Sequence, residues 1–380
     1  MTGMTGMTLP AAGEGTEFEA LQQALAGSRH LGAGVRMQQL VAGGHARLPL
    51  PGQGATLQRW RALAEVSRHD LSLAKLYEGH TDAVAILREL HAPDGVAGSG
   101  AESLWGTWAS EAPGGRVTFA EEDRSGDSGA SGPDPRPAGA ADLGHADVRT
   151  VWITGTKAWC SGAEHASHAL LTAWRTDGRG PQLVAVDLLQ PGVTVSTQAW
   201  RAIGMADSAS AEVTFQHVRA VRVGDEGDYL NRPGFWHGGA GIAACWWGGA
   251  LALGHALQAA VANAPAAQRT PFRLAALGRV DVALGATAAL LKDTADWIDR
   301  QPADDAFAPA LRARQAAEAC ARRVLDETGR ALGATPFCRD ADFARMSADL
   351  PVFIRQSHAD RDDAALGERL ATQEGTPWSL

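Results

Sequence analysis

The change in residue periodicity between residues 103 and 221 constrains the fold of this 380-residue chain more than any other feature. Within this stretch, short runs rich in Val, Ile, Thr and Leu are separated by Gly and Pro, which is the pattern of a β-sheet. Before and after it, apolar residues recur at intervals of three or four, as on one face of a helix. The sequence therefore predicts an α+β protein with a β-domain between two helical domains.

We place these domains at residues 1–100, 101–222 and 223–380. Strands are predicted at 117–119, 150–154, 169–173, 183–186 and 193–195. Helices are predicted within 17–90 and at 242–261, 274–298, 308–331 and 347–369. Residues 121–148 consist mainly of Asp, Gly, Ser, Pro and Ala. They bury too little apolar surface to offset the entropy cost of ordering, so we expect a flexible insertion there.

Composition excludes several classes of protein. The net charge of −9 argues against a general nucleic-acid-binding surface. No apolar run approaches the roughly 18 residues needed to span a bilayer, and the N-terminus lacks the pattern of a signal peptide. The four cysteines show no C-x-x-C spacing. We therefore expect a cytoplasmic protein with reduced thiols, no metal site and no membrane span.

Three motifs follow one another in the β-rich region. Residues 153–163 read ITGTKAWCSGA, residues 202–205 read AIGM and residues 211–218 read AEVTFQHV. This order resembles the middle domain of the acyl-CoA dehydrogenase family, where a G-x-K-x-W-I-T strand lies behind a flavin. The helix–sheet–helix order extends the resemblance over nearly the whole chain. It implies a sandwich- or barrel-like middle β-domain, a C-terminal four-helix bundle and FAD as the cofactor.

The resemblance also implies which residues bind the flavin ring. Trp159 and Ser161 match a tryptophan that packs on the isoalloxazine ring and a hydroxyl near its N5 atom. A flat apolar wall and a nearby donor suit a ring that becomes negatively charged on reduction. Thr107 and Ser110 belong to LWGTWASE at 104–111, which resembles the loop that contacts the flavin pyrimidine. Without the flanking motif, Trp159 and Ser161 would be an ordinary buried strand tryptophan and a turn serine.

A second group resembles the part of the family that binds the rest of FAD. Arg269 and Phe272 match an R-x-x-F-G motif, whose arginine binds the FAD pyrophosphate of a neighbouring subunit. Gly333 stands in a half-preserved glycine-rich segment that lies near the adenine in the family. The resemblance therefore implies a homodimer or homotetramer.

The position of the catalytic base departs from the family pattern. Counting along the C-terminal motif puts Ser357 where most members carry a glutamate. Some members carry it on the long helix after the β-domain, but residues 238–253 contain no acidic residue. His358 is the candidate to take over the role of base, although a histidine on a surface helix is more often solvated than catalytic.

Three hypotheses for function follow. The first is an FAD-dependent oxidoreductase that acts on CH–CH bonds of an acyl-CoA or related substrate, with atypical or impaired base chemistry and an electron-transfer partner. The second is a flavin-dependent monooxygenase or oxidase on the same fold. The third is a catalytically degenerate member that binds FAD or serves as an assembly protein.

Overall fold

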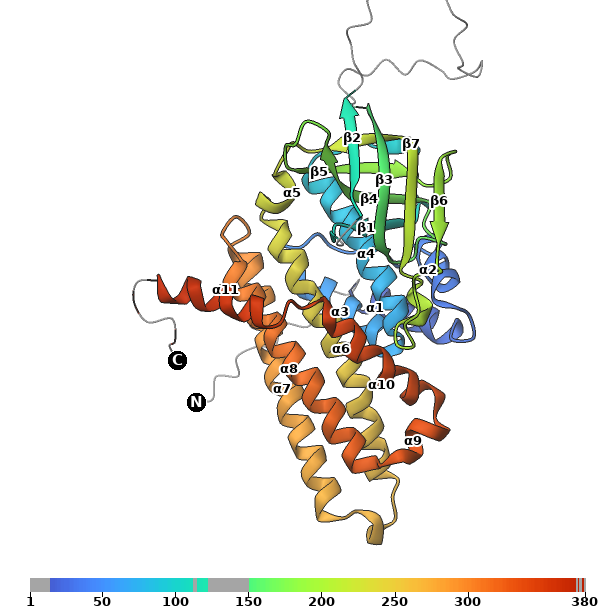
Figure 1. Cartoon of the computed structure of the whole chain (residues 1–380). Helices are drawn as coiled ribbons and strands as arrows, with labels where there is room; N and C mark the ends of the chain where they lie inside the picture. The colour runs from blue at the N-terminus through green and yellow to red at the C-terminus, as the bar shows by residue number, and fades with distance from the viewer. Residues whose placement is uncertain (1–13, 112–114, 122–149, 374, 376–377, 379–380) are drawn as a thin grey trace, which may run out of the picture.

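The computed structural model describes residues 14–111, 115–121, 150–373, 375 and 378 (Figure 1). From residue 122 onward, the expected flexible insertion at 121–148 lies outside the described residues. Figure 1 shows a β-domain lying above long helices, with α4 running close beneath the sheet. The helix–sheet–helix order predicted from the sequence is present in the described elements.

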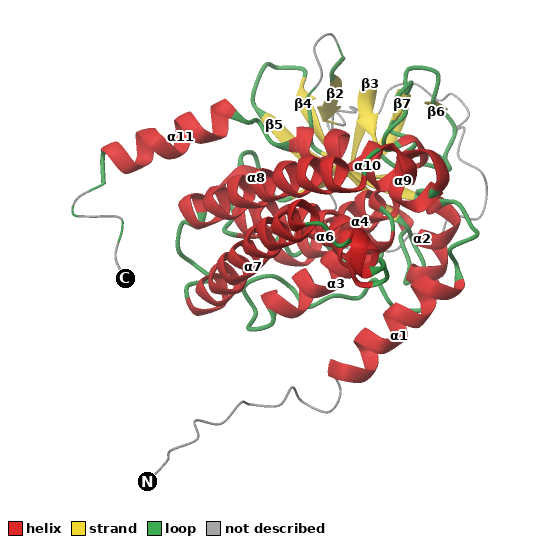
Figure 2. Cartoon of the chain, turned by 90° about the horizontal axis from the view of Figure 1, so that it is seen from below, coloured by secondary structure: helices red, strands yellow, loops and turns green. Residues whose placement is uncertain are grey.

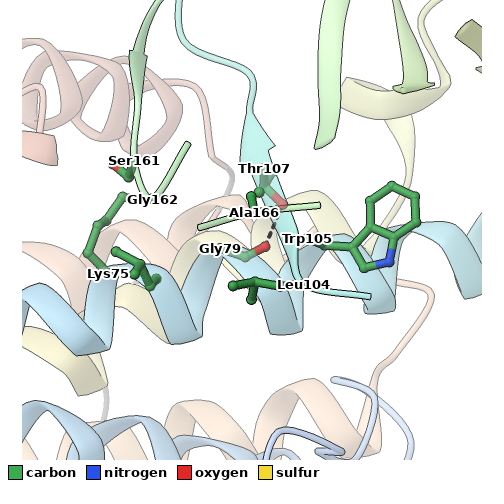
Figure 3. Close-up of a pocket in the computed structure, with 10 residues that line it drawn as sticks. Lys75, Gly79, Leu104, Trp105, Thr107, Ser161, Gly162 and Ala166 are labelled. Atoms are coloured by element: carbon green, nitrogen blue, oxygen red, sulfur yellow. Dashed lines mark hydrogen bonds between the residues drawn. The ribbon is translucent and has the colours of Figure 1, made fainter. Parts of the chain in front are cut away.

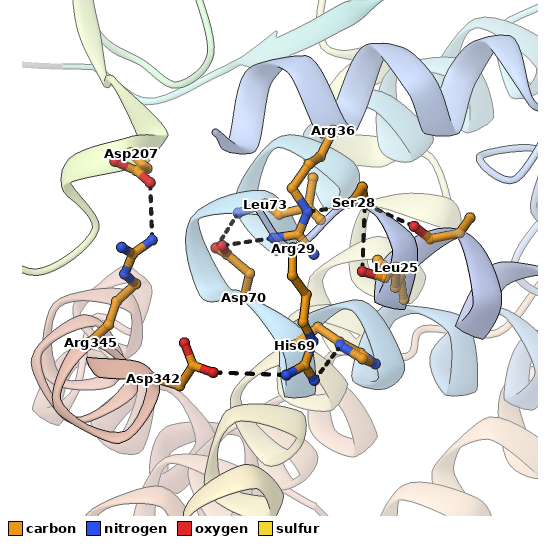
Figure 4. Close-up of polar contacts among 11 residues, drawn as sticks. Leu25, Ser28, Arg29, Arg36, His69, Asp70, Leu73, Asp207, Asp342 and Arg345 are labelled. Carbon is orange, nitrogen blue, oxygen red and sulfur yellow. Dashed lines mark hydrogen bonds and ion pairs between the residues drawn. The ribbon is translucent and has the colours of Figure 1, made fainter. Parts of the chain in front are cut away.

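The N-terminal helices are α1 (Glu14–Gly27), α2 (Ala33–Ala42), α3 (Thr56–His69) and α4 (Leu71–Glu89), followed by a short 3-10 turn, η1 (Val96–Gly98). Asp70 separates α3 from α4 because its backbone is extended, and its carboxylate caps α4 by accepting from Leu73 N at 2.9 Å. The same carboxylate accepts from Arg36 on α2 at 3.0 Å (Figure 4). This buried ion pair joins three helices.

In the described residues the β-domain has seven strands: β1 (Trp105–Trp108), β2 (Val117–Glu121), β3 (Thr150–Cys160), β4 (His168–Arg175), β5 (Pro181–Asp187), β6 (Val193–Ser196) and β7 (Ala211–Val223). Pairing runs β2–β3–β7–β5–β4, and β4 pairs with β2 again, so these five strands close into a small barrel. β1 extends this ring beside β4, and β6 pairs with β7. All five predicted strands are present, whereas β1 and β7 were not among the predicted strands.

The interior of the barrel is filled by apolar side chains such as Phe119, Ile153 and Phe215, each at most 1% exposed. Gly155 in β3 has φ 130°, and a Cβ atom there would collide with the carbonyl oxygen of Arg116. Only glycine therefore allows β2 to approach β3 at this point.

The C-terminal helices are α5 (Asp228–Asn231), α6 (Gly234–Ala262), α7 (Pro271–Arg300), α8 (Phe307–Leu332), α9 (Ala334–Arg339), α10 (Ala341–Phe353) and α11 (Asp360–Ala371). The prediction of one helix over 347–369 is wrong, since α10 ends at Phe353 and α11 begins at Asp360. The backbone leaves helical geometry at Ser357, which is extended, and at Ala359, which has φ 48°. Figure 2 shows α11 extending away from the other helices.

Two of these helices are long and apolar enough to cross a membrane, judged by length and composition alone. The apolar window of α6 is 72% buried, because α6 is the central helix on which α3 and α8 pack. The corresponding window of α7 is only 22% buried. Most of the apolar window of α7 is therefore exposed in the described structure.

Candidate functional site

Trp159 stands at an irregular position in β3. The pairing of β3 with β7 shifts register between Lys157 and Cys160, and Trp159 adopts φ 58°, in the left-handed region. Such bulges re-aim side chains, and strained backbone of this kind concentrates at functional sites. The indole is 53% exposed, whereas neighbouring Cys160 is fully buried. The bulge thus presents a flat apolar ring at the surface.

An ion pair between a buried lysine and a partly exposed glutamate fixes the segment after β1 against this part of β3. Lys157 Nζ lies 2.6 Å from Glu111 Oε1 and 2.7 Å from Thr172 Oγ1. Burial lowers the pKa of Lys157, and the Glu111 carboxylate opposes that shift. Trp108 Nε1 also donates to the carbonyl of Ser161 at 3.2 Å. These contacts bring the segment containing Ser110 and the β3 segment containing Trp159 and Ser161 together.

The gap between α4 and β1 is nearly filled. A cavity of about 10 Å³ remains, which has room for about one water molecule (Figure 3). The cavity is lined by Lys75, Leu76, Gly79, Leu104, Trp105, Gly106, Thr107, Ser161, Gly162 and Ala166. Thr107 and Ser161, both predicted to contact flavin, therefore share one cavity.

Two hydrogen bonds hold this gap closed. Thr107 Oγ1 donates to the carbonyl of Gly79 at 2.6 Å, and the backbone N–H of Trp105 donates to His80 Nδ1 at 3.1 Å. Burial lowers the pKa of His80 to about 4, so its ring is neutral and accepts this bond at neutral pH. A bulky substrate can enter here only if α4 and β1 separate.

A chain of hydroxyls continues from Ser161 into the interior. Ser161 Oγ lies 2.8 Å from Ser210 Oγ, which lies 3.1 Å from Ser208 Oγ. Ser208 in turn donates to the carbonyl of Met205 at 2.8 Å. The N–H of Met205 donates to Asp349 Oδ1 on α10 at 2.5 Å. The chain thus begins in the β-domain and leads to a loop anchored on a C-terminal helix.

Sequence reasoning missed Ser208, Ser210 and Asp349. The Ser-Ala-Ser sequence lies between the AIGM motif and β7, and this position was the only available signal. Lys75 and Glu78 were also missed. Lys75 lines the cavity and its Nζ lies 2.8 Å from Glu78 Oε2, while burial raises the pKa of that carboxyl. The three-residue spacing on a helix was the signal for this pair.

The residues predicted to bind the rest of FAD lie elsewhere in the chain. Arg269 donates to the carbonyls of Ala262 and Ala264 at 2.7 and 2.9 Å, so its guanidinium caps the end of α6. Phe272 is 84% exposed, and Gly333 joins α8 to α9 with φ 69°. Figure 1 places the α6–α7 and α8–α9 turns at the end of the helices remote from the β-domain.

The candidates for the catalytic base lie in the turn between α10 and α11. Ser357 is buried, and its Oγ accepts from the N–H of Ala359 at 3.1 Å. The His358 side chain is 71% exposed, and its Nδ1 lies 3.3 Å from Asp362 Oδ1. The turn borders an open, charged cleft of about 600 Å³ lined by Gln315, Glu318, Ala319, Arg322, Arg323, Ala359, Asp360 and Asp363. The structure therefore places no carboxylate at Ser357 and leaves His358 largely in solvent.

In the described residues, no group of three or more His, Cys, Asp or Glu side chains is placed to hold a metal ion.

Comparison with known proteins agrees with this architecture. Residues 138–218 match the family model for the acyl-CoA dehydrogenase middle domain. This match confirms the resemblance inferred from the motifs. No curated protein matches the chain in sequence.

Several solved structures share the fold over nearly the whole chain. TdsC from Paenibacillus sp. A11-2, solved with FMN and indole, has 16% identity and a TM-score of 0.75, covering 96% of this chain and 99% of its own. A nitrososynthase from Micromonospora carbonacea var. africana has 18% identity and a TM-score of 0.72, with coverages of 95% and 98%. Methanesulfinate monooxygenase MsuC from Pseudomonas fluorescens has 17% identity and a TM-score of 0.70, with the same coverages. The chain thus has the acyl-CoA dehydrogenase-like fold.

Proposed function

We propose that this chain is a flavin-dependent oxidoreductase that reacts with oxygen, as a monooxygenase or oxidase. One feature supports the choice within the fold: the count along the family motif puts Ser357 where the glutamate is expected, and the hydroxyl of Ser357 accepts from the N–H of Ala359. Helix α6 offers no substitute, because it contains neither Asp nor Glu. The similar proteins TdsC and MsuC are both described as monooxygenases, which supports the same choice.

The residues at the end of β3 suit a flavin ring. Trp159 offers a half-exposed aromatic face, and the Lys157–Glu111 pair holds the Ser110 segment beside it. Ser161 and Thr107 offer hydroxyl oxygens in the adjoining cavity. A bound flavin supplies the redox chemistry, either accepting a hydride or, when reduced, reacting with oxygen. The protein binds and orients the ring, and the closed α4–β1 contact keeps bulk water from this side.

We propose FMN as the flavin, in place of the FAD expected from the sequence. The guanidinium of Arg269 uses two of its five N–H donors on backbone carbonyls of its own chain, which holds it against the end of α6. FMN lacks the adenosine part of FAD and does not need the pyrophosphate contact predicted for Arg269. TdsC and KijD3, which share the fold, were both solved with FMN.

Acyl-CoA desaturation is the less favoured reaction. It needs a base near the substrate, whereas Ser357 is no carboxylate and α6 contains neither Asp nor Glu. A degenerate flavin-binding or assembly protein stays the third alternative, and it predicts flavin binding without turnover.

Anaerobic titration of the purified protein with FMN and FAD tests the proposal. We expect FMN to bind more tightly, acyl-CoAs to leave the bound flavin oxidised, and chemically reduced enzyme to consume oxygen faster than free reduced FMN when a substrate is present. Absence of flavin binding would refute the proposal. Rapid bleaching by an acyl-CoA would favour the dehydrogenase instead.

A further inference from the structure

The open cleft of about 600 Å³ lies between α8 and the first turn of α11, apart from the residues proposed to hold a flavin. Its volume is in the range of sites that bind small molecules. One wall is a single face of α8, made by Gln315, Glu318, Ala319, Arg322 and Arg323. The other wall is made by Ala359, Asp360 and Asp363. Figure 2 shows α11 leading away from the other helices, which leaves this cleft open to solvent.

Glu318 lines this cleft with half of its carboxylate unpaired. The residue is 3% exposed, and its Oε1 accepts from Arg322 and, at 2.9 Å, from Arg355. Its Oε2 is buried and has no hydrogen-bond partner among the described residues. A buried charged oxygen without a partner is costly, more so than a neutral polar atom. The carboxylate of Glu318 therefore lacks one donor.

Glu327, nine residues further along α8, shows the same arrangement completed. It is 6% exposed, and Arg279 donates to both of its oxygens, at 2.6 and 2.7 Å. Arg323 adds a contact with Oε1 at 3.4 Å. Both glutamates are thus buried and each is paired with two arginines, but Glu318 keeps one oxygen free. Pairing between helices accounts for Glu327 completely and for Glu318 only in part.

The groups around Glu318 Oε2 indicate what kind of ligand would complete it. Gln315, one turn earlier on α8, has a buried Nε2 with no acceptor in the described part of the chain. Asp360 and Asp363 face Glu318 across the cleft and form no ion pair with any described residue. Acids are common in the first turn of a helix, so these two alone would not indicate a ligand. A cationic N–H group suits Glu318, and an acceptor beside it suits Gln315.

We propose that this cleft binds a small ligand that carries a primary ammonium group next to a hydrogen-bond acceptor. The ammonium group donates to Glu318 Oε2, and the acceptor takes the N–H of Gln315. Asp360 and Asp363 stabilise the positive charge from the opposite wall. Arg322 and Arg355 cover Glu318 with side chains that are about half exposed, so rotation of either one admits the ligand. The site is independent of the proposed flavin function.

Titration of the whole chain with ethanolamine, followed by ligand-observed NMR, tests the proposal. Ethylene glycol and acetate are the neutral and anionic counterparts. We expect ethanolamine to bind with a dissociation constant on the order of 1 mM, at least about tenfold below that of either counterpart. Glu318→Gln should weaken binding about tenfold or more, because a charge-assisted hydrogen bond is lost. Gln315→Leu should weaken it about fivefold.

Glu327→Gln is the matched control, because it neutralises a buried glutamate of the same helix whose oxygens are both paired, and it should change the constant less than about twofold. No binding of ethanolamine, equal binding of ethylene glycol or acetate, or an equal loss in Glu327→Gln would overturn the proposal. Thermal unfolding of each variant separates loss of folding from loss of recognition. If Glu318→Gln fails to fold, the effect of Gln315→Leu decides.

Discussion

At the scale of single residues, the backbone of Trp159 matters more than its identity. Successive side chains of a regular strand point alternately into the core and out of it. The bulge at Lys157–Cys160 turns the indole of Trp159 outward beside Ser161. Trp152 on the same strand stacks on His217 with ring centroids 4.4 Å apart. Two tryptophans of one strand thus differ, since Trp152 has an aromatic partner and Trp159 is 53% exposed.

We predict that Trp159→Ala weakens flavin binding by about tenfold or more, because it removes most of the aromatic contact area with the ring. Trp152→Ala is the control and should change flavin affinity less than twofold. Fluorescence or absorbance titration of both variants checks this. Equal losses in the two variants would show that Trp159 has no special role.

We predict that short- and medium-chain acyl-CoAs do not reduce the bound flavin at a catalytic rate. Without a carboxylate at Ser357, proton abstraction lacks the roughly 10²–10⁴-fold that a general base supplies. His358→Ala should change nothing in this assay, because its imidazole is 71% exposed and paired with Asp362. Stopped-flow absorbance measures both. Bleaching that disappears in His358→Ala would instead identify histidine as the base.

At the scale of elements, the loop containing η2 (Ala206–Ser208) joins the β-domain to α10. Asp349 accepts from Met205, and Arg345 reaches Asp207 at 3.2 Å from the same helix (Figure 4). Burial raises the pKa of Asp349 to about 6, and the charge of Asp70 adds to the shift. The contact between these elements therefore depends on pH.

The raised pKa of Asp349 decides whether stability rises or falls with pH. The folded protein keeps a proton on Asp349 that the unfolded chain loses near pH 4, so this group makes stability fall as pH rises from 4 to 6. The full effect is about 3 kcal/mol, from a shift of about two units. The Asp349→Asn variant keeps an acceptor for Met205 but has no carboxyl to titrate. The difference between its free energy of unfolding and that of wild type should therefore rise by up to about 3 kcal/mol from pH 4 to pH 7. Urea denaturation at both pH values checks this, and a constant difference would contradict it.

At the scale of the whole molecule, α7 carries apolar side chains that the described part of the chain leaves exposed. Val282 is 69% exposed, Leu274 is 50% exposed and Phe272, at the start of the helix, is 84% exposed. Exposed large apolar side chains on a weakly buried helix are typical of a contact surface. Self-association through a symmetric interface is the simplest way to bury such a helix.

We predict that the protein forms a homodimer or a dimer of dimers through α7. Val282→Asp should shift it toward the monomer, because a charge would be buried in the interface without a partner. Leu189→Asp, which changes a residue 80% exposed on the β-domain, is the control and should leave the assembly intact. Light scattering measures the mass of each. A wild-type monomer at micromolar concentration would refute the prediction.

Local patterns in the sequence determined much of the secondary structure. The strands at 117–119, 150–154, 169–173, 183–186 and 193–195 and the long helices were all predictable, because periodicity reports which face of an element is buried. The GTKAW and AIGM motifs likewise predicted the family resemblance. The break between α10 and α11 and the strands β1 and β7 were missed, since each depends on what packs against it.

The tertiary structure alone decided the chemistry of the candidate site. The hydroxyl of Ser161 contacts that of Ser210, which lies 49 residues later in the sequence. The N–H of Met205 donates to Asp349, which lies 144 residues later. The carbonyls that engage Arg269 and the closure of α4 on β1 likewise arise only in the folded chain. A residue type shows which hydrogen bonds a side chain is able to make. The folded neighbours decide which of them it makes, because each donor proton can serve one good acceptor at a time.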